Sequence, residues 1–255
     1  MGKYNFGGKN IYFEEHGQGE PLLLLHGNTS SGRMFDPVVP FFSRKYRVIT
    51  IDFLGCGRSD RIMPWPDDLW HVWGDQVKAV CSYLCNDKVN IIGVSGGALA
   101  AINVALDDPE LVNAVIADSF EGLEAVPSVT RDIKYGRMQA KQNDRFRKYL
   151  ESIHGADWEE VFDSDTDAVI RHALKIGAFF HKPIEELKVR IMLTGSLEDE
   201  MFPKGHYIDL FKNICGRTAY AQAYTFEKGG HPAMLSNAEE FLRVADDFLC
   251  GNAIC

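Results

Sequence analysis

The sequence predicts an α/β protein built on a mostly parallel β-sheet with helices on both faces. Short apolar runs recur along the chain, and longer segments with helical spacing separate them. The short runs are apolar at both odd and even positions, which is typical of strands buried between two helical layers. Alternating strands and helices supply the crossovers that parallel pairing requires. The 255 residues are enough for one large domain with a substantial core.

The first expected element is an antiparallel hairpin at the edge of the sheet. Gly7–Gly8 is typical of a tight turn, and it is flanked by Tyr4–Phe6 and Ile11–Glu14. The buried strands that follow are expected at Leu22–Leu25, Val48–Ile51, Val89–Val94, Val112–Ala117 and Val189–Leu193, and Tyr220–Phe226 is a further strand-like segment. Helices are expected at Leu69–Leu84 and at Ala98–Leu106, and a C-terminal helix is expected to start near Asn237.

One region interrupts this alternation. From about Gly122 to Leu187 there is no good buried strand, and helical patterns at Arg131–Ser152 and Ala168–Phe180 flank an acid-rich stretch. A long helical insertion between two strands predicts a cap over the sheet. Residues 122–187 would form this cap, and residues 1–121 with 188–255 would form the core. The alternative is a set of ordinary peripheral helices without a lid function.

Composition excludes several classes of function. The net charge of −9 repels nucleic-acid phosphates and anionic membrane surfaces, so neither is expected as a partner. Apolar runs are too short to span a membrane, and the first residues lack the apolar segment of a secretory signal. A cytoplasmic protein is therefore expected. Its six scattered cysteines form no CxxC pair, which favours reduced thiols and no metal site.

A candidate nucleophile is Ser95, in the segment GVSGG at 93–97. An apolar strand precedes this segment and a helix follows it. Such a strand–turn–helix elbow forces the serine into strained backbone geometry, which requires very small neighbours. The hydroxyl then lies beside a helix N-terminus, where developing negative charge is favoured. The alternative is a glycine-rich turn with an incidental serine.

A serine hydroxyl needs a base and the base needs an orienting acid. His231 follows the strand expected at Tyr220–Phe226 and should lie at the carboxyl edge of the sheet, where α/β active sites form. His206 is the second candidate for the base. Glu198, Asp199 and Glu200 all follow a buried strand. Asp199 is preferred as the acid because it stands four residues before Pro203, which starts the next turn or helix, and Glu198 is its alternative.

Two backbone amides are expected to stabilise an oxyanion. One is the amide of Gly96, which follows the nucleophile. The other is the amide of Asn28, in the loop after Leu22–Leu25.

The chain resembles the α/β-hydrolase superfamily over nearly all of its length. It is most similar to the cap-bearing branch of esterases, C–C bond hydrolases and cofactor-free haloperoxidase-like proteins. The motifs that carry the resemblance occur in the family's order, at Leu24–Gly27, Asp52–Ser59, Gly93–Gly97, Gly195–Pro203 and Gly230–Pro232. The resemblance implies an eight-stranded sheet, a Ser95–Asp199–His231 triad and a helical lid between strands six and seven. It assigns Asp52–Ser59 to a structural turn.

Two positions depart from relatives of known activity. Val94 precedes the nucleophile where many relatives have histidine, which weakens analogies about substrate. Asn28 resembles the halide-binding asparagine of haloalkane dehalogenases, but those enzymes use an aspartate nucleophile and this chain has Ser95.

The expected activity is hydrolysis of small esters, thioesters or lactones through an acyl-enzyme on Ser95, without a cofactor. Five aromatic residues are candidates for an apolar pocket and equally for plain core: Trp65, Trp70, Trp73, Phe179 and Phe180. Two alternatives remain open. One is a ligand receptor or partner-binding module with weak turnover, and the other is C–C hydrolase or haloperoxidase-like activity.

Overall fold

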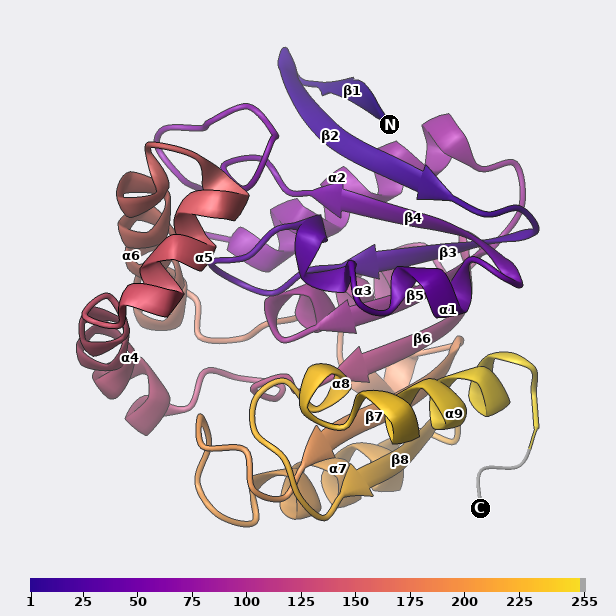
Figure 1. Ribbon diagram of the computed structural model, residues 1–255. Helices are drawn as coiled ribbons and strands as arrows, with labels where there is room; N and C mark the ends of the chain where they lie inside the picture. The colour runs from indigo at the N-terminus through magenta and orange to yellow at the C-terminus, as the bar shows by residue number, and fades with distance from the viewer. Residues whose placement is uncertain (253–255) are drawn as a thin grey trace.

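The computed structural model describes residues 1–252 and has an eight-stranded sheet between helices (Figure 1). The strands are β1 (Gly2–Phe6), β2 (Lys9–His16), β3 (Glu20–Leu25), β4 (Tyr46–Asp52), β5 (Val89–Val94), β6 (Val112–Asp118), β7 (Arg190–Ser196) and β8 (Ala221–Phe226). The helices are α1 (Val39–Phe42), α2 (Leu69–Leu84), α3 (Gly96–Asp107), α4 (Pro127–Ala140), α5 (Asp144–His154), α6 (Trp158–Lys175), α7 (His206–Arg217), α8 (Ala233–Ser236) and α9 (Ala238–Leu249). The predicted α/β class with an eight-stranded sheet is confirmed.

The strands are ordered β1-β2-β4-β3-β5-β6-β7-β8 across the sheet. β1 pairs antiparallel with β2, and β2 pairs antiparallel with β4, which confirms the expected edge hairpin. All pairs from β4 to β8 are parallel. The loops that follow β3, β5, β6, β7 and β8 therefore meet at one edge of the sheet, where ligands of open α/β sheets bind.

Helices cover both faces of the sheet because its central strands are apolar on both. Leu23 and Leu25 of β3 pack on the face covered by α2, α3 and α7. Leu22 and Leu24 pack on the opposite face, against α1 and α9. In Figure 1, α1, α8 and α9 lie in front of the sheet and α2 and α3 behind it. Within residues 1–252, no helix has the length and apolarity to cross a membrane.

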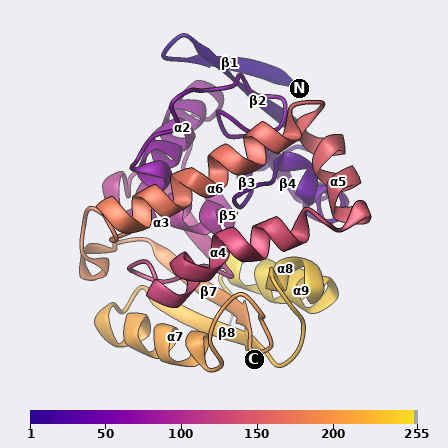
Figure 2. The same ribbon diagram turned by 90° about the vertical axis from the view of Figure 1, so that its left-hand side faces the viewer.

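Three helices, α4, α5 and α6, lie between β6 and β7, and we call residues 127–175 the helical insert. Figures 1 and 2 show the insert over the edge at which the parallel strands end. Two expected helix boundaries were wrong. The pattern at Arg131–Ser152 is split by a break at 141–143, where Asn143 caps the start of α5. The acid-rich stretch is the first half of α6, where acidic side chains favour a helix N-terminus.

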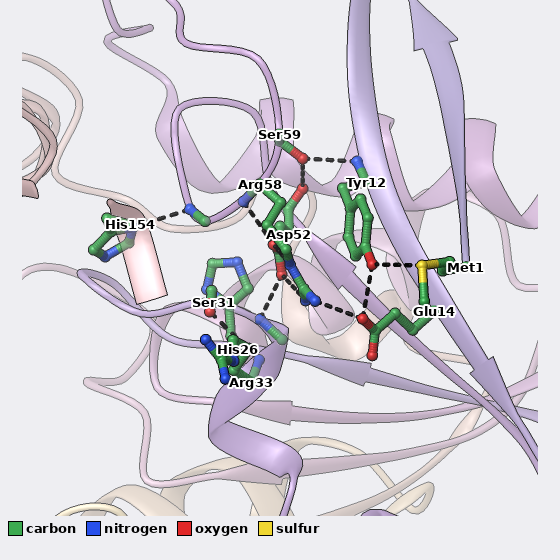
Figure 3. Close-up of polar contacts among 12 residues, drawn as sticks. Met1, Tyr12, Glu14, His26, Ser31, Arg33, Asp52, Arg58, Ser59 and His154 are labelled. Atoms are coloured by element: carbon green, nitrogen blue, oxygen red, sulfur yellow. Dashed lines mark hydrogen bonds and ion pairs between the residues drawn. The ribbon is translucent and has the colours of Figure 1, made fainter. Parts of the chain in front are cut away.

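The turn after β4 is built on the buried carboxylate of Asp52 (Figure 3). Asp52 accepts hydrogen bonds from Gly32 N at 2.7 Å and from Arg58 N at 2.8 Å, and it pairs with the Arg58 guanidinium. Arg58 also pairs with Glu14 of β2. The turn is therefore tied to the neighbouring strand and to the loop after β3.

Candidate active site

Ser95 lies in the sharp turn between β5 and α3. Its backbone angles are φ 55° and ψ −120°, a strained conformation for a residue with a side chain. Positions 93 and 97 must be glycine because the turn packs there against other backbone. A Cβ on Gly93 would collide with the backbone of Gly97, and a Cβ on Gly97 would collide with the carbonyl groups of Leu25 and His26. The local sequence therefore fits the predicted elbow.

His231 lies in the loop between β8 and α8, at the same edge of the sheet. Its Nδ1 atom is 2.8 Å from Oδ2 of Asp199, which follows β7. The chain just after His231 is also fixed, because Ala233 N donates to Ser119 Oγ at 2.8 Å and Met234 N donates to Asp118 at 3.0 Å. Both polar partners come directly from the end of β6. The imidazole is thus oriented by three neighbouring strands.

Asp199 is a buried carboxylate with several hydrogen-bond donors. Met201 N donates to Oδ1 at 2.9 Å, and the buried Tyr207 hydroxyl donates to Oδ2 at 2.8 Å. Burial raises the pKa of Asp199, but the hydrogen bonds from His231, Met201 and Tyr207 outweigh it and hold the pKa below its ordinary value. The group is therefore an anion at neutral pH and suited to hold a protonated imidazole.

The two alternative residues lie elsewhere. Glu198 is exposed, and its side chain makes no hydrogen bond to His231 within the described chain. His206 begins α7, stacks on Phe202 with 4.6 Å between ring centroids, and does not line the cavity that contains Ser95. The structure thus brings Asp199 and His231 together and leaves Glu198 and His206 outside the pair.

Ser95 and His231 line one cavity of about 740 Å³ between the sheet edge and the helical insert. Across residues 1–252, no hydrogen bond joins the Ser95 hydroxyl directly to His231. Contacts between a nucleophile and its base commonly tighten when substrate binds. The rest of the wall is mainly apolar, and residues from the insert contribute much of it: Val129, Ile133, Arg137, Phe146, Tyr149 and Phe162.

The loop after β3 passes directly beside Ser95. A Cβ on Gly27 would lie 3.0 Å from the Ser95 Cβ. His26 orients the peptide between Gly27 and Asn28. Its Nε2 accepts from Phe53 N at 3.1 Å, so Nδ1 carries the proton and donates to Gly27 O at 2.8 Å. Burial lowers the pKa of His26 to about 4, so this neutral tautomer persists at neutral pH.

The two predicted oxyanion donors both have available N–H groups. In a trans peptide the N–H points opposite the carbonyl, so the bond to Gly27 O turns the Asn28 N–H away from His26. Among residues 1–252 the Asn28 N–H has no hydrogen-bond acceptor. Gly96 is the first residue of α3, where the backbone N–H lacks an acceptor inside the helix.

Sequence reasoning missed two polar residues that reach the site from other elements. Tyr207 of α7 bonds Asp199, and Asp165 of α6 bonds the side chain of Asn28 at 2.9 Å. Each lies within a helix whose sequence shows only an ordinary polar or aromatic position. No local signal identifies either residue, since their roles arise from contacts between distant parts of the chain.

The five aromatic residues proposed for the pocket do not line the cavity that contains Ser95. Trp70, Trp73 and Phe179 are buried in the core. Phe180 packs partly buried against that core, and Trp65 lines a separate hollow near the turn after β4. Within residues 1–252, no group of three or more His, Cys, Asp or Glu side chains has the arrangement of a metal site.

Comparisons with known proteins place this geometry in a family. A 2-hydroxy-6-oxo-6-(2'-aminophenyl)hexa-2,4-dienoic acid hydrolase of Metapseudomonas resinovorans is 24% identical over 98% of this chain and 90% of its own length. A pimeloyl-[acyl-carrier protein] methyl ester esterase of Legionella pneumophila is 32% identical over 94% of this chain and 99% of its own length. The structure of a meta-cleavage product hydrolase from Pseudomonas fluorescens IP01 matches with a TM-score of 0.75 at 18% identity, covering 98% of both chains.

The family model for the alpha/beta hydrolase fold matches residues 20–157, which is more than half of the chain. This stretch contains Ser95, the loop with Asn28 and the turn built on Asp52. The match agrees with the sheet order and with the curated relatives over nearly the full length. The chain therefore belongs to the α/β-hydrolase family.

Proposed function

We propose that the protein is a serine hydrolase that cleaves small carboxylic esters, thioesters or lactones through an acyl-enzyme on Ser95. One observation carries the proposal. Ser95, in a strained turn at a helix N-terminus, lines the same cavity as His231, which is bonded to the buried anion Asp199. A nucleophile, a base and an orienting acid are the parts that acyl transfer to water requires.

The proposed reaction has two halves. Ser95 Oγ attacks the substrate carbonyl carbon while His231 Nε2 takes the hydroxyl proton, and Asp199 stabilises the imidazolium through Nδ1. The oxyanion accepts hydrogen bonds from the N–H groups of Gly96 and Asn28. The intermediate then collapses, and His231 returns the proton to the leaving alcohol or thiol. A water molecule, deprotonated by His231, attacks the acyl-enzyme and releases the acid and free Ser95.

We propose further that the helical insert is a cap that forms the roof of the substrate cavity. Its residues supply apolar wall on the side opposite Ser95, including Ile133, Phe146 and Phe162. Arg137 is the one cation among the residues that line the cavity in the described chain. The mainly apolar wall supports a small acyl substrate.

Several relatives favour a second candidate activity. Curated relatives with similarity across nearly the whole chain are named hydrolases of 2-hydroxy-6-oxo-dienoates, which are substrates cleaved at a carbon–carbon bond. Val94 and Pro232 flank the proposed nucleophile and base here, and neither can donate a side-chain hydrogen bond to a dienoate. We therefore prefer ester hydrolysis and keep carbon–carbon cleavage as the alternative.

The cytoplasm is the proposed location. The described cysteines Cys56, Cys81, Cys85, Cys215 and Cys250 are all unpaired thiols. Free thiols of this kind are typical of reducing compartments.

A panel of p-nitrophenyl esters of graded acyl length tests the proposal, with a 2-hydroxy-6-oxo-dienoate run in parallel. Wild type should hydrolyse a subset of the esters, and Ser95→Ala should lower kcat by about 10⁴-fold or more. A fluorophosphonate probe followed by peptide mapping should label Ser95. Labelling of another serine would contradict the nucleophile, and turnover of the dienoate alone would favour the second candidate. Thermal stabilisation by a ligand without ester turnover would instead indicate a receptor.

A further inference from the structure

We propose that Asp165 and His154 of the helical insert are positioning residues that hold the loop bearing the Asn28 N–H in its catalytic geometry. Oxyanion stabilisation then depends on the insert being docked on the core. This inference rests on the proposed serine hydrolase function and deepens it. Neither residue touches the reacting atoms, and both act through Asn28 and Thr29.

Asp165 is a fully buried carboxylate on α6 that faces the loop after β3. Its Oδ2 accepts from Asn28 Nδ2 at 2.9 Å and from Thr29 N at 3.1 Å. Its Oδ1 accepts from Arg137 Nη1 of α4 at 2.7 Å. A buried charge is tolerated when paired and hydrogen-bonded in this way. One side chain thus joins two helices of the insert to two consecutive residues of the loop.

His154 at the end of α5 holds the same loop from a second direction. Its Nδ1 accepts from Gly57 N at 2.9 Å, so its Nε2 carries the proton and donates to Thr29 O at 3.2 Å. Burial lowers the pKa of His154, which keeps this neutral tautomer at neutral pH. Figure 3 shows His154 reaching the turn built on Asp52. Both the N–H and the carbonyl of Thr29 are therefore bonded to the insert.

The loop needs this support because Thr29 is strained. Its φ of 57° is in the left-handed region, which is unfavourable for a β-branched residue. Without partners from the insert, the peptide groups around it would relax toward ordinary conformations. Asn28 cannot compensate by flipping its amide, since Asn28 Oδ1 already accepts from Trp70 Nε1 at 3.1 Å. His26 orients the Gly27–Asn28 peptide itself, whereas Asp165 and His154 hold the Asn28 side chain and the peptides on both sides of Thr29. The Asn28 N–H therefore keeps its direction only when the insert supports the part of the loop that follows the peptide held by His26.

The variant Asp165→Asn tests this coupling. It places an amide N–H₂ among the donors of Asn28, Thr29 and Arg137. Because the guanidinium is the charged donor, the amide oxygen should face Arg137 and leave the bonds from Asn28 and Thr29 unmade. Removing an oxyanion donor outright costs about 10²–10³ in kcat, and misaiming one should cost about 10- to 100-fold. KM should stay within about threefold, because the bonds lost act on the transition state. The matched control is Asp163→Asn on the same helix, α6. Asp163 is exposed, and this change weakens its ion pair with Lys141.

A trifluoromethyl ketone adds to Ser95 and mimics the oxyanion intermediate. A variant that is only less stable would keep its affinity for this compound. The compound's affinity should fall in parallel with kcat/KM in Asp165→Asn, whereas affinity for the product acid should stay within about threefold. Unchanged kcat, or an equal loss of affinity for both ligands, would overturn the inference. If Asp165→Asn does not fold, His154→Gln decides by the same measurements. Failure of the fluorophosphonate to label Ser95 in wild type would instead overturn the proposed function.

Discussion

Oδ2 of Asp199 accepts a hydrogen bond from the Tyr207 hydroxyl as well as facing His231. An oxygen that already accepts one hydrogen bond attracts a further proton less strongly. The proton affinity of Asp199, the acid of the proposed triad, therefore depends on both His231 and Tyr207. Tyr207 lies in α7, which is remote from Ser95 in sequence. This arrangement leads to two predictions at the scale of single residues.

The first concerns the identity of the acid. Asp199→Asn keeps the size of the side chain but removes the charge that stabilises the imidazolium, so kcat should fall about 10³- to 10⁴-fold. Glu198→Gln is the matched control and should remain within about twofold, because Glu198 is exposed. Steady-state kinetics on the preferred ester measure both. A larger loss in Glu198→Gln than in Asp199→Asn would reverse the assignment.

The second concerns Tyr207. Tyr207→Phe removes one of the hydrogen bonds that hold the pKa of Asp199 low, so Asp199 becomes more basic and stabilises the imidazolium more strongly. The acidic limb of the kcat/KM profile should move to higher pH by a fraction of a unit. Loss of the buried hydrogen bond should cost about 1–2 kcal/mol in the free energy of unfolding. A limb that stays in place or moves to lower pH would contradict this account.

The site residues predicted from the sequence are those whose proposed roles follow from a local pattern. Ser95 is marked by flanking glycines, and His231 and Asp199 each follow a strand of a parallel sheet, so their meeting could be expected. The choice between Asp199 and Glu198 could not be made firmly, because adjacent residues share one loop signal. Asp165 could not be found, since its hydrogen-bond partner Asn28 is 137 positions away.

At the scale of elements, the turn between β5 and α3 depends on close backbone approach. Gly97→Ala would place a Cβ against the carbonyl oxygens of Leu25, at the end of β3, and of His26, in the loop that follows, and this backbone can move only at a large cost in free energy. We expect a loss of about 3 kcal/mol or more in the free energy of unfolding. Gly216→Ala is the control, because Gly216 is an exposed helical glycine with open space around it. It should stabilise by about 0.5–1 kcal/mol, and urea denaturation measures both.

The connection from β6 to α4 contains a titratable group. Glu121 accepts from Val126 N at 2.6 Å, just before α4, and burial raises its pKa to about 7 against the opposing effect of this hydrogen bond. Its folded-state pKa lies above the unfolded value, so its contribution to stability is full below about pH 4.5. That contribution is lost as pH rises through about 7.

Glu121→Gln keeps an acceptor for Val126 N and removes the titration. Its melting temperature relative to wild type should therefore rise between pH 5 and pH 8.5, by about 3–6 °C. Differential scanning fluorimetry across this range checks the prediction. A difference that is constant with pH, or that falls, would show that Glu121 does not titrate in this window.

Elements of the core were easier to predict than those of the insert for a physical reason. Core strands such as β5 are buried on both faces, which gives an unambiguous apolar run. The insert contacts solvent on one side and the core on the other, so its apolar positions are sparse. α4 has no buried residue at all, and its end at Ala140 could not be read from a pattern of mixed charge.

For the whole molecule, the sheet and the insert together define a cavity that neither forms alone. Its volume of about 740 Å³ should limit the acyl group, so activity on p-nitrophenyl esters should peak and then fall as the chain lengthens. Phe146→Ala removes a partly buried ring from the cavity wall and should move the peak to longer chains. The acyl chain length at which activity is highest, compared between wild type and variant, measures the effect. An unchanged optimum would place the acyl group elsewhere in the cavity.

The strands along the chain, the edge hairpin and the presence of a long insertion were predictable from the sequence and its resemblance to a family. The shape of the cavity was not, because it depends on how three helices pack against the segments that follow four strands, β3, β5, β7 and β8. The aromatic residues chosen from sequence show this difference. Trp70 and Trp73 are buried in the core, whereas Phe146 and Phe162 line the cavity.

The helices of the insert differ in how many of their residues are buried, so they should open at different free-energy costs. α6 places seven residues in the interior and bonds the core through Asp165, whereas α4 places none there. Segments with few interior contacts open at low free-energy cost. Backbone amides of α4 should therefore exchange with deuterium well before those of α6. Small molecules would then enter the cavity beneath α4, while the part of its roof formed by α6 stays closed.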